Sequence, residues 1–176
     1  MPSTDDISPV PNHHADHAGF SGFSGLVAAV GFLSGREPAG RLAIELSGLT
    51  SGDRLVDVGC GPGAAAQLAR REGAQVIGVD PAPVMLRVAK LRWRSSGIIW
   101  RLGTAESVPV DDGWADVVWS LATVHHWVDI DTGLDEVCRV LAPGGRLVAL
   151  ERRITDPDAD GVASHGWTAE QAESFA

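Results

Sequence analysis

The sequence contains no tyrosine, two methionines and only two cysteines, Cys60 and Cys138, among its 176 residues. Two thiols are too few for a disulfide framework or for a cysteine-rich zinc site. No apolar run approaches the roughly 20 residues that a membrane-spanning helix needs, and the acidic N-terminus lacks the basic region of a secretory signal. These absences predict a protein of the reducing cytoplasm, with no bound metal and no membrane partner.

Basic residues are scarce as well, because 14 Lys and Arg stand against 23 Asp and Glu, for a net charge of −9. A surface of this charge repels phosphates, which argues against a general nucleic-acid binder or an anionic-membrane binder. The 44% apolar content is enough for an ordinary core, and the length predicts about one domain. The 21 glycines and 10 prolines lie between apolar segments, as in a turn-rich globular domain.

Short apolar runs alternate with helical segments along most of the chain. We predict strands at 55–58, 76–79, 98–102, 115–119 and 147–150, and helices at 39–49, 64–72, 84–93 and 131–141. Strands separated by helices of about ten residues indicate βαβ units and a mainly parallel sheet. The runs are continuously apolar, as expected when both faces of the sheet are covered. Ligands of such sheets bind beyond the carboxyl ends of the strands, which is where we look for chemistry.

A glycine-rich turn, 57-DVGCGPG-63, follows the first predicted strand. Its three glycines let the backbone approach a ligand, and the next helix directs its free N–H groups to the same place. Asp80 ends the second predicted strand, 23 residues after Asp57. An acidic residue at this position can accept both hydroxyls of a ribose. Together these features predict an adenosine-type ligand.

Two details argue against a nicotinamide dinucleotide as that ligand. The glycines are spaced G-x-G-x-G, whereas the dinucleotide fingerprint is G-x-G-x-x-G. Asp57 also lies within the turn, where its carboxylate would repel a pyrophosphate but could bind an ammonium group. A cationic ligand with an amino-acid end therefore fits better than a phosphate ligand.

Five segments in the expected order resemble the motifs of class I S-adenosylmethionine-dependent methyltransferases. These segments are 56-VDVGCGPG-63, 79-VDP-81, 103-GTAE-106 with its following prolyl and acidic residues, 115-ADVVWS-120, and 139-RVL-141 with 143-PGG-145. The sequence 125-HHW-127 resembles the small-molecule subgroup called methyltransferase type 11. The resemblance implies an α/β fold: a Rossmann-like, doubly wound, mainly parallel sheet of order 3-2-1-4-5. It also implies S-adenosylmethionine as cofactor and a small-molecule methyl acceptor as partner.

The resemblance further implies which residues contact the cofactor. Asp57 would orient its amino group, and Asp80 would accept the ribose hydroxyls. Ala105 would offer a backbone N–H to the adenine. Thr104 stands where relatives usually carry Asp, so Glu106 is an alternative partner for the adenine amino group. The full predicted cofactor set is Asp57, Gly59, Gly61, Gly63, Asp80, Pro81, Thr104, Ala105, Glu106 and Ser120.

His125 and His126 lie just beyond the fourth predicted strand and are the candidate catalytic residues. The sulfonium makes its methyl group electrophilic, so in-line transfer needs mainly alignment and exclusion of water. A base is needed only when the nucleophile starts protonated, and an imidazole can serve as that base near neutral pH. The alternative is that these histidines pack or hydrogen-bond a loop. Trp127 and Trp167 likewise either line a substrate pocket or seal the core.

The resemblance divides the chain into an N-terminal arm and possible lid (1–35), a cofactor-binding core (36–151) and a truncated C-terminal segment (152–176). Phe20 and Phe23 are candidate lid residues in the arm. We expect a truncated gene product that lacks the usual strands 6 and 7. Its fifth strand would then be an exposed edge, which favours reduced stability or association, including a homodimer through that edge.

Two other functions remain open at this point. One is a catalytically inactive module that binds S-adenosylmethionine or a partner. The other is an NAD(P)-dependent oxidoreductase, which would bind a nicotinamide cofactor instead of S-adenosylmethionine.

Overall fold

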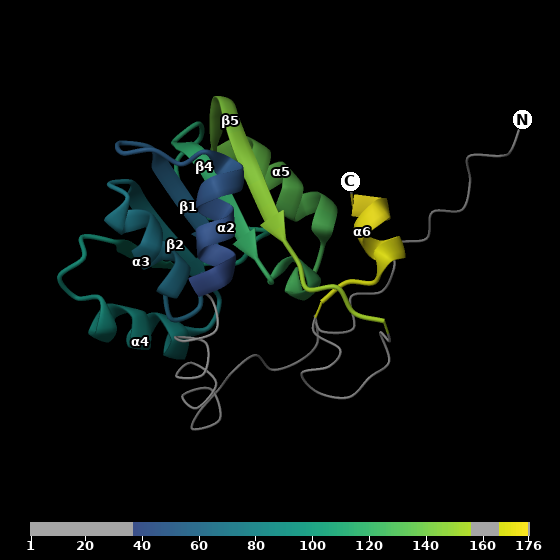
Figure 1. Ribbon diagram of the computed structural model, residues 1–176, viewed down its shortest axis with the longest axis horizontal. Helices are drawn as coiled ribbons and strands as arrows, with labels where there is room; N and C mark the ends of the chain where they lie inside the picture. The colour runs from purple at the N-terminus through teal and green to yellow at the C-terminus, as the bar shows by residue number, and fades with distance from the viewer. Residues whose placement is uncertain (1–36, 156–165, 176) are drawn as a thin grey trace, which may run out of the picture.

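The structure is a computed structural model that describes residues 37–155 and 166–175. Five strands form one sheet: β1 (Arg54–Val58), β2 (Gln75–Asp80), β3 (Ile99–Leu102), β4 (Ala115–Leu121) and β5 (Leu141–Leu150). Their spatial order is β3-β2-β1-β4-β5, and every neighbouring pair is parallel (Figure 1). The predicted fold class and strand order are confirmed.

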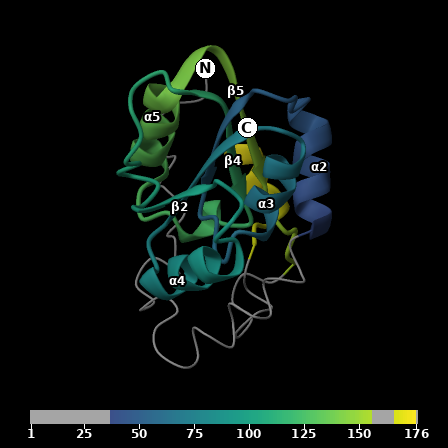
Figure 2. The same cartoon turned by 90° about the vertical axis from the view of Figure 1, so that its left-hand side faces the viewer.

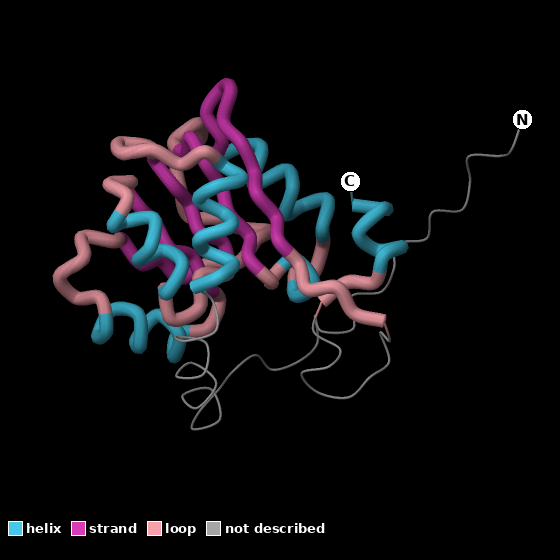
Figure 3. Tube along the Cα trace, in the orientation of Figure 1, coloured by secondary structure: helices cyan, strands magenta, loops and turns pink. Residues whose placement is uncertain are grey.

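Helices alternate with the strands, as the pattern predicts, except between β3 and β4, which a loop joins (Figure 3). They are α2 (Glu37–Ser47), α3 (Ala64–Arg71), α4 (Pro83–Arg92), the 3₁₀ helix η1 (Val124–His126), α5 (Ile130–Val140) and α6 (Ala169–Phe175). Local chemistry explains two of the starts. Pro83 occupies the first turn of α4, where its missing N–H costs nothing. The Asp129 side chain accepts the Thr132 N–H and so caps α5.

The sheet lies between two helical layers (Figure 2). On one face, the alanines of α3 and Ala43 of α2 pack against Leu55, Val117 and Trp119 of the central strands. On the other face, α5 packs against a cluster of strand valines that includes Val56. Trp127 and Trp167 both belong to this second cluster. They pack in the core, which is one of the two predicted alternatives. Consecutive strand residues point to opposite faces, which divides the two clusters.

β5 is an edge of the described sheet, and none of its residues is fully buried. Its first part differs from the predicted turn at 143–145. Ala115 pairs with Leu141 but Val117 pairs with Arg146, so residues 142–145 loop out between paired positions. Arg146 then reaches the C-terminal end of α2, where its guanidinium donates to the Ser47 carbonyl. β5 is thus an edge strand of the described sheet, with residues 147–150 partly buried, and association through it stays a prediction.

Several predictions fall on residues without a description. The N-terminal arm and lid, with Phe20 and Phe23, lie outside the described ranges, as do residues 156–165. Within 37–155 and 166–175, no helix has the length and apolarity needed to cross a bilayer. The division of the chain into an arm, a core and a C-terminal segment stays a prediction.

Candidate functional site

The two strand-end carboxylates lie on the same face of the sheet. Asp57 of β1 is paired with Gly78 of β2, and Asp80 follows two residues later on β2. Because strand side chains alternate, both carboxylates point to the α3 side. They are nearly fully buried, at 2% exposure for Asp57 and 6% for Asp80. Two buried carboxylates at the carboxyl ends of neighbouring strands are a costly arrangement that suits a polar or cationic ligand.

The glycine-rich turn is tied directly to β2. The N–H groups of Gly59 and Cys60 both donate to the Val79 carbonyl, at 2.8 and 3.0 Å. The Gly61 N–H donates to the Asp80 carboxylate at 2.7 Å, so this turn and Asp80 form one unit. Gly63 ends the turn at the N-cap of α3.

All three glycines of the turn have left-handed backbones, but Gly59 and Gly61 differ in their surroundings. At Gly59 (φ +73°), an added Cβ would meet the Thr123 side chain at 2.5 to 2.7 Å. At Gly61 (φ +54°), an added Cβ would meet no described atom within 4 Å, although the residue is buried. Apart from its chain neighbours, no described residue comes within 4 Å of this Cβ position, which lies next to the Asp80 carboxylate.

The turn after β4 completes the centre of the site. Ser120 is fully buried, and its hydroxyl shares a 2.7 Å hydrogen bond with the Thr123 hydroxyl. Thr123 in turn donates to the Val58 carbonyl at the end of β1, at 3.1 Å. Between them, Ala122 has φ +53° and is the one non-glycine residue with positive φ among those described. This backbone conformation is uncommon for alanine and is typical of turns that position functional groups.

His125 is held by a carboxylate that the sequence reasoning missed. Its Nδ1 lies 2.8 Å from Oε2 of Glu151, and the two side chains are only 5% and 8% exposed. The other oxygen of Glu151 accepts the Val124 N–H at 2.6 Å. His126 is partly exposed, and its ring centroid lies 4.0 Å from that of His125. Glu151 directly follows β5, so the rule that strand ends carry function could have found it.

The remaining predicted cofactor residues lie around the end of β3. The Gly103 N–H donates to the Asp80 carbonyl at 3.3 Å, which brings the loop after β3 next to β2. Thr104 and Pro81 are exposed, whereas Ala105 is buried in the core. The Glu106 carboxylate accepts the N–H groups of Val128 and Asp129, at 2.6 and 3.3 Å. Glu106 therefore links this loop to the start of α5, and its contact with adenine stays a prediction.

Two partly exposed ion pairs lie outside the site. At the amino ends of β1 and β4, Arg54 donates through Nε and Nη2 to the two oxygens of Asp116, and this hydrogen bonding lowers the pKa of Asp116 to about 2. On α5, hydrogen bonding to Arg139 lowers the pKa of the Glu136 carboxyl. Residues 37–155 and 166–175 contain no group of three or more metal-ligating side chains.

Comparison with known proteins identifies the family. Residues 56–149, just over half of the chain, match the family described as "Methyltransferase domain". The chain is 38% identical over 112 residues to the demethylmenaquinone methyltransferase of Tropheryma whipplei (strain Twist), covering 63% of this chain and 46% of that protein. It is also 38% identical over 117 residues to the ubiquinone biosynthesis O-methyltransferase of Methylobacterium sp. (strain 4-46), covering 65% and 45%. The chain spans about half the length of these curated relatives.

A solved structure agrees on the fold. The crystal structure of a SAM-dependent methyltransferase from Aquifex aeolicus superposes with a TM-score of 0.73 and covers 85% of each chain. The two sequences are 16% identical, so this likeness concerns the fold alone.

Proposed function

The chain belongs to the methyltransferase domain family, and from this premise we propose that it transfers a methyl group from S-adenosylmethionine directly to a small-molecule acceptor. The observation that carries the proposal is that Asp57 and Asp80 lie on one face of the sheet, beside the position at Gly61 that no described side chain fills. These groups suit a ligand with a cationic amino-acid end and a ribose.

The residues around the site fit S-adenosylmethionine in polarity and in the space that they leave. Asp80 already accepts N–H groups from Gly61 and Ala82, but each carboxylate oxygen has a second lone pair for a ribose hydroxyl. Asp57 offers a buried anion to the amino group, and the backbone at Gly61 leaves space for the ligand. The adenine would lie against the loop after β3, with the Ala105 N–H as donor. When bound, the cofactor supplies an electrophilic methyl group on a positively charged sulfur.

We assign the base, where the acceptor needs one, to His125. Glu151 accepts the Nδ1–H of the ring at 2.8 Å, and this hydrogen bond leaves Nε2 as the basic nitrogen. The same carboxylate holds the Val124 amide, so the ring and its backbone are fixed by one side chain. His126 is the second candidate, because its ring packs against that of His125. A hydroxyl acceptor would lose its proton to this imidazole as the methyl group is transferred.

The names of the two curated relatives support a small-molecule acceptor. Both are named for steps in the chemistry of quinones, and one is named as an O-methyltransferase. A ring hydroxyl of a hydroquinone is therefore the first acceptor class to test. This choice also suits the base proposed above, since a phenolic hydroxyl starts protonated.

Titration calorimetry with S-adenosylmethionine and with NAD(P), followed by an acceptor screen that detects S-adenosylhomocysteine, tests the proposal. We expect binding of S-adenosylmethionine alone and product with at least one hydroxylated aromatic acceptor. Binding without any turnover would select the inactive module, and binding of NAD(P) instead would select the oxidoreductase.

The base is tested separately, with the acceptor that the screen identifies. His125→Ala should lower kcat by about 10²–10⁴-fold while cofactor affinity stays unchanged. His126→Ala is the matched comparison, since it removes the neighbouring imidazole, whereas the Glu151 hydrogen bond is made by His125. Unchanged turnover in both variants would rule out a catalytic role for this pair.

A further inference from the structure

The 103–113 loop between β3 and β4 receives several of its hydrogen bonds from α5. The loop forms no strand or helix, so its buried backbone groups need partners from elsewhere. Glu136 and Arg139 of α5 supply partners at Val108, and Arg101 of β3 donates to the Pro109 carbonyl. Glu106 of the loop acts in the other direction, because its carboxylate accepts the N–H groups of Val128 and Asp129 just before α5. The hydrogen bonds of Glu106, Glu136 and Arg139 therefore link the loop to α5 or to the segment just before α5.

Glu136 and Arg139 act on the same loop residue. Glu136 accepts the Val108 N–H at 2.8 Å, and Arg139 donates through Nη2 to the Val108 carbonyl at 2.7 Å. Arg139 also donates through Nη1 to the Val110 carbonyl at 2.8 Å and to the Asp112 carboxylate at 2.6 Å. Both backbone groups of Val108 are therefore bound by one ion pair on α5.

The ion pair between Arg139 and Glu136 is joined by two hydrogen bonds. The guanidinium of Arg139 meets both oxygens of Glu136, at 2.7 and 2.8 Å, which is the bidentate geometry. Hydrogen bonding to Glu136 and Asp112 raises the pKa of Arg139 further above its usual range, so the pair stays charged. An ion pair with this geometry can determine the position of the loop residue to which it is bonded.

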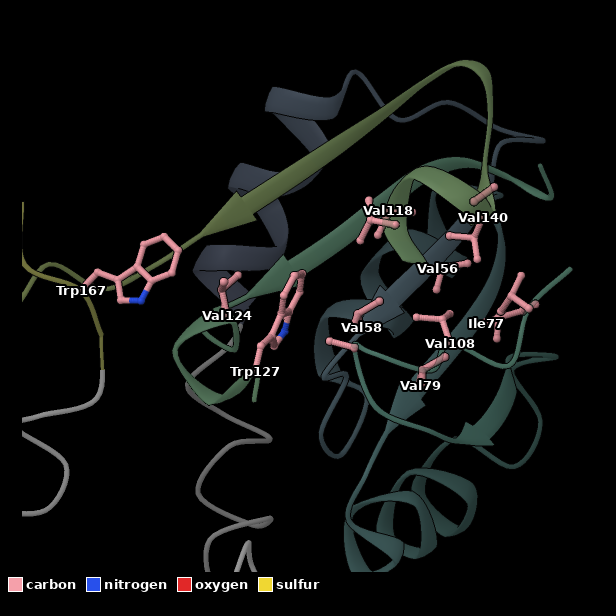
Figure 4. Packing of buried hydrophobic residues seen from close by; sticks show 14 residues of the cluster. Val56, Val58, Ile77, Val79, Val108, Val118, Val124, Trp127, Val140 and Trp167 are labelled. Atoms are coloured by element: carbon pink, nitrogen blue, oxygen red, sulfur yellow. The ribbon is translucent and has the colours of Figure 1, made fainter. Parts of the chain in front are cut away.

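The buried side chains of the loop add a second constraint. Ala105, Val108 and Val110 are all at most 5% exposed and belong to the core cluster under α5. Figure 4 shows Val108 among the valines of β1 and β2 in this cluster. Only two residues separate Ala105 from Val108, and the Ser107 N–H bonds back to the Thr104 carbonyl. The position of the Ala105 amide is therefore coupled to that of Val108.

We propose that Glu136 and Arg139 are positioning residues for the adenine end of the cofactor site. They hold the Val108 backbone, and through it they fix the Ala105 N–H and the Thr104 side chain where the adenine binds. This inference rests on the proposed cofactor, and neither residue contacts the cofactor itself. Without the pair, the loop keeps its apolar contacts but loses the hydrogen bonds that set its backbone orientation.

The test compares two ligands that differ only in the base, S-adenosylhomocysteine and S-inosylhomocysteine. Adenine N1 can accept the Ala105 N–H, whereas hypoxanthine carries a hydrogen at N1 and lacks the amino group. The wild type should therefore prefer the adenine ligand by about tenfold or more, the value of one or two hydrogen bonds. Arg139→Gln should reduce this preference to about twofold, mainly by weakening the adenine ligand.

A matched variant separates positioning from stability. Arg54→Gln breaks another two-pronged Arg–Asp pair, with Asp116, at the amino ends of β1 and β4 and away from the site. It should lower the melting temperature yet keep the wild-type preference for adenine. If Arg139→Gln behaves in the same way, the positioning role is wrong and the pair only stabilises the fold.

A second variant covers the case in which Arg139→Gln does not fold. Glu136→Gln keeps an amide oxygen as acceptor but replaces the ion pair by a weaker interaction between the charged guanidinium and a neutral side chain. It should lower the adenine preference by a smaller factor of about three, and an unchanged preference would overturn the inference. Failure of the wild type to bind S-adenosylhomocysteine would instead overturn the proposed function.

Discussion

Gly59 and Gly61, two of the three left-handed glycines of the turn, should respond differently to the same substitution. Gly59→Ala and Gly61→Ala both place a Cβ on a backbone with positive φ, +73° and +54°. This change alone costs about 1–2 kcal/mol for a non-glycine residue. At Gly59 the new methyl group would also meet Thr123 at 2.5 to 2.7 Å, while at Gly61 it would meet no described atom within 4 Å.

The magnitudes follow from these contacts. Overpacking adds about 1–3 kcal/mol, so Gly59→Ala should lower the free energy of unfolding by about 2–5 kcal/mol in total. Gly61→Ala should lower it by only about 1–2 kcal/mol. Its main effect should be on the ligand, because the methyl group enters the space that we assign to the cofactor. We expect its affinity for S-adenosylhomocysteine to fall by at least about tenfold, since a steric clash of about 1.4 kcal/mol is enough for that.

Urea denaturation measures the two stabilities, and titration calorimetry with S-adenosylhomocysteine measures the affinities. Gly59→Ala should show the larger loss of stability. Gly61→Ala should be folded at 25 °C and should bind poorly. Equal losses of stability would contradict the packing difference between the two sites. A folded Gly61→Ala protein with wild-type affinity would show that the space at Gly61 is not part of the cofactor site.

Three further predictions concern stability, measured by denaturant or acid unfolding. Asp116 has a pKa of about 2 in the folded protein against 3.8 in the unfolded chain, so its contribution is present above pH 3.8 and is lost as the pH falls toward 2. Asp116→Asn should therefore cost about 1 kcal/mol at pH 7, a value reduced by screening at 34% exposure, and should flatten the acid dependence between pH 4 and pH 2; an unchanged acid limb would contradict this. Ala122→Gly should raise the free energy of unfolding by about 0.5–1 kcal/mol because it relieves the positive φ, and a loss of stability would mean that this backbone is unstrained. Gly133→Ala should destabilise the protein by about 1–2 kcal/mol despite the better helix propensity of alanine, because the new Cβ would meet the Trp127 ring at 2.5 to 2.8 Å; a gain in stability would refute this packing argument.

The sequence predicts the parts of this fold that local patterns determine. Continuous apolar runs bounded by glycine and proline mark the strands, and the turn at 57–63 together with Asp80 marks the cofactor side of the sheet. The strand order follows from the family resemblance, and the structure confirms it. The boundary of β5 differs because a four-residue bulge interrupts its pairing, and no local signal separates such a bulge from a turn.

The missing parts of the site are long-range contacts of ordinary polar residues. Glu151 reaches His125 across 26 residues, and Thr123 reaches the Val58 carbonyl across 65. Nothing in the residues next to Glu151 indicates such a partner, although its place after a strand was a usable signal. The sequence around Arg139 predicts only an ordinary helix end. Its role could not be predicted, because the side chain bonds to three residues of the 103–113 loop and to Glu136 of its own helix.

The central claim is that Asp57 and Asp80 bind the two ends of one ligand. The most direct measurement is a pair of titrations, with S-adenosylhomocysteine and with methylthioadenosine, which keeps the ribose and adenine but lacks the amino acid. Asp57→Asn should weaken only the first ligand, whereas Asp80→Asn should weaken both. Equal effects of Asp57→Asn on the two ligands, or no effect of Asp80→Asn on methylthioadenosine, would contradict the account.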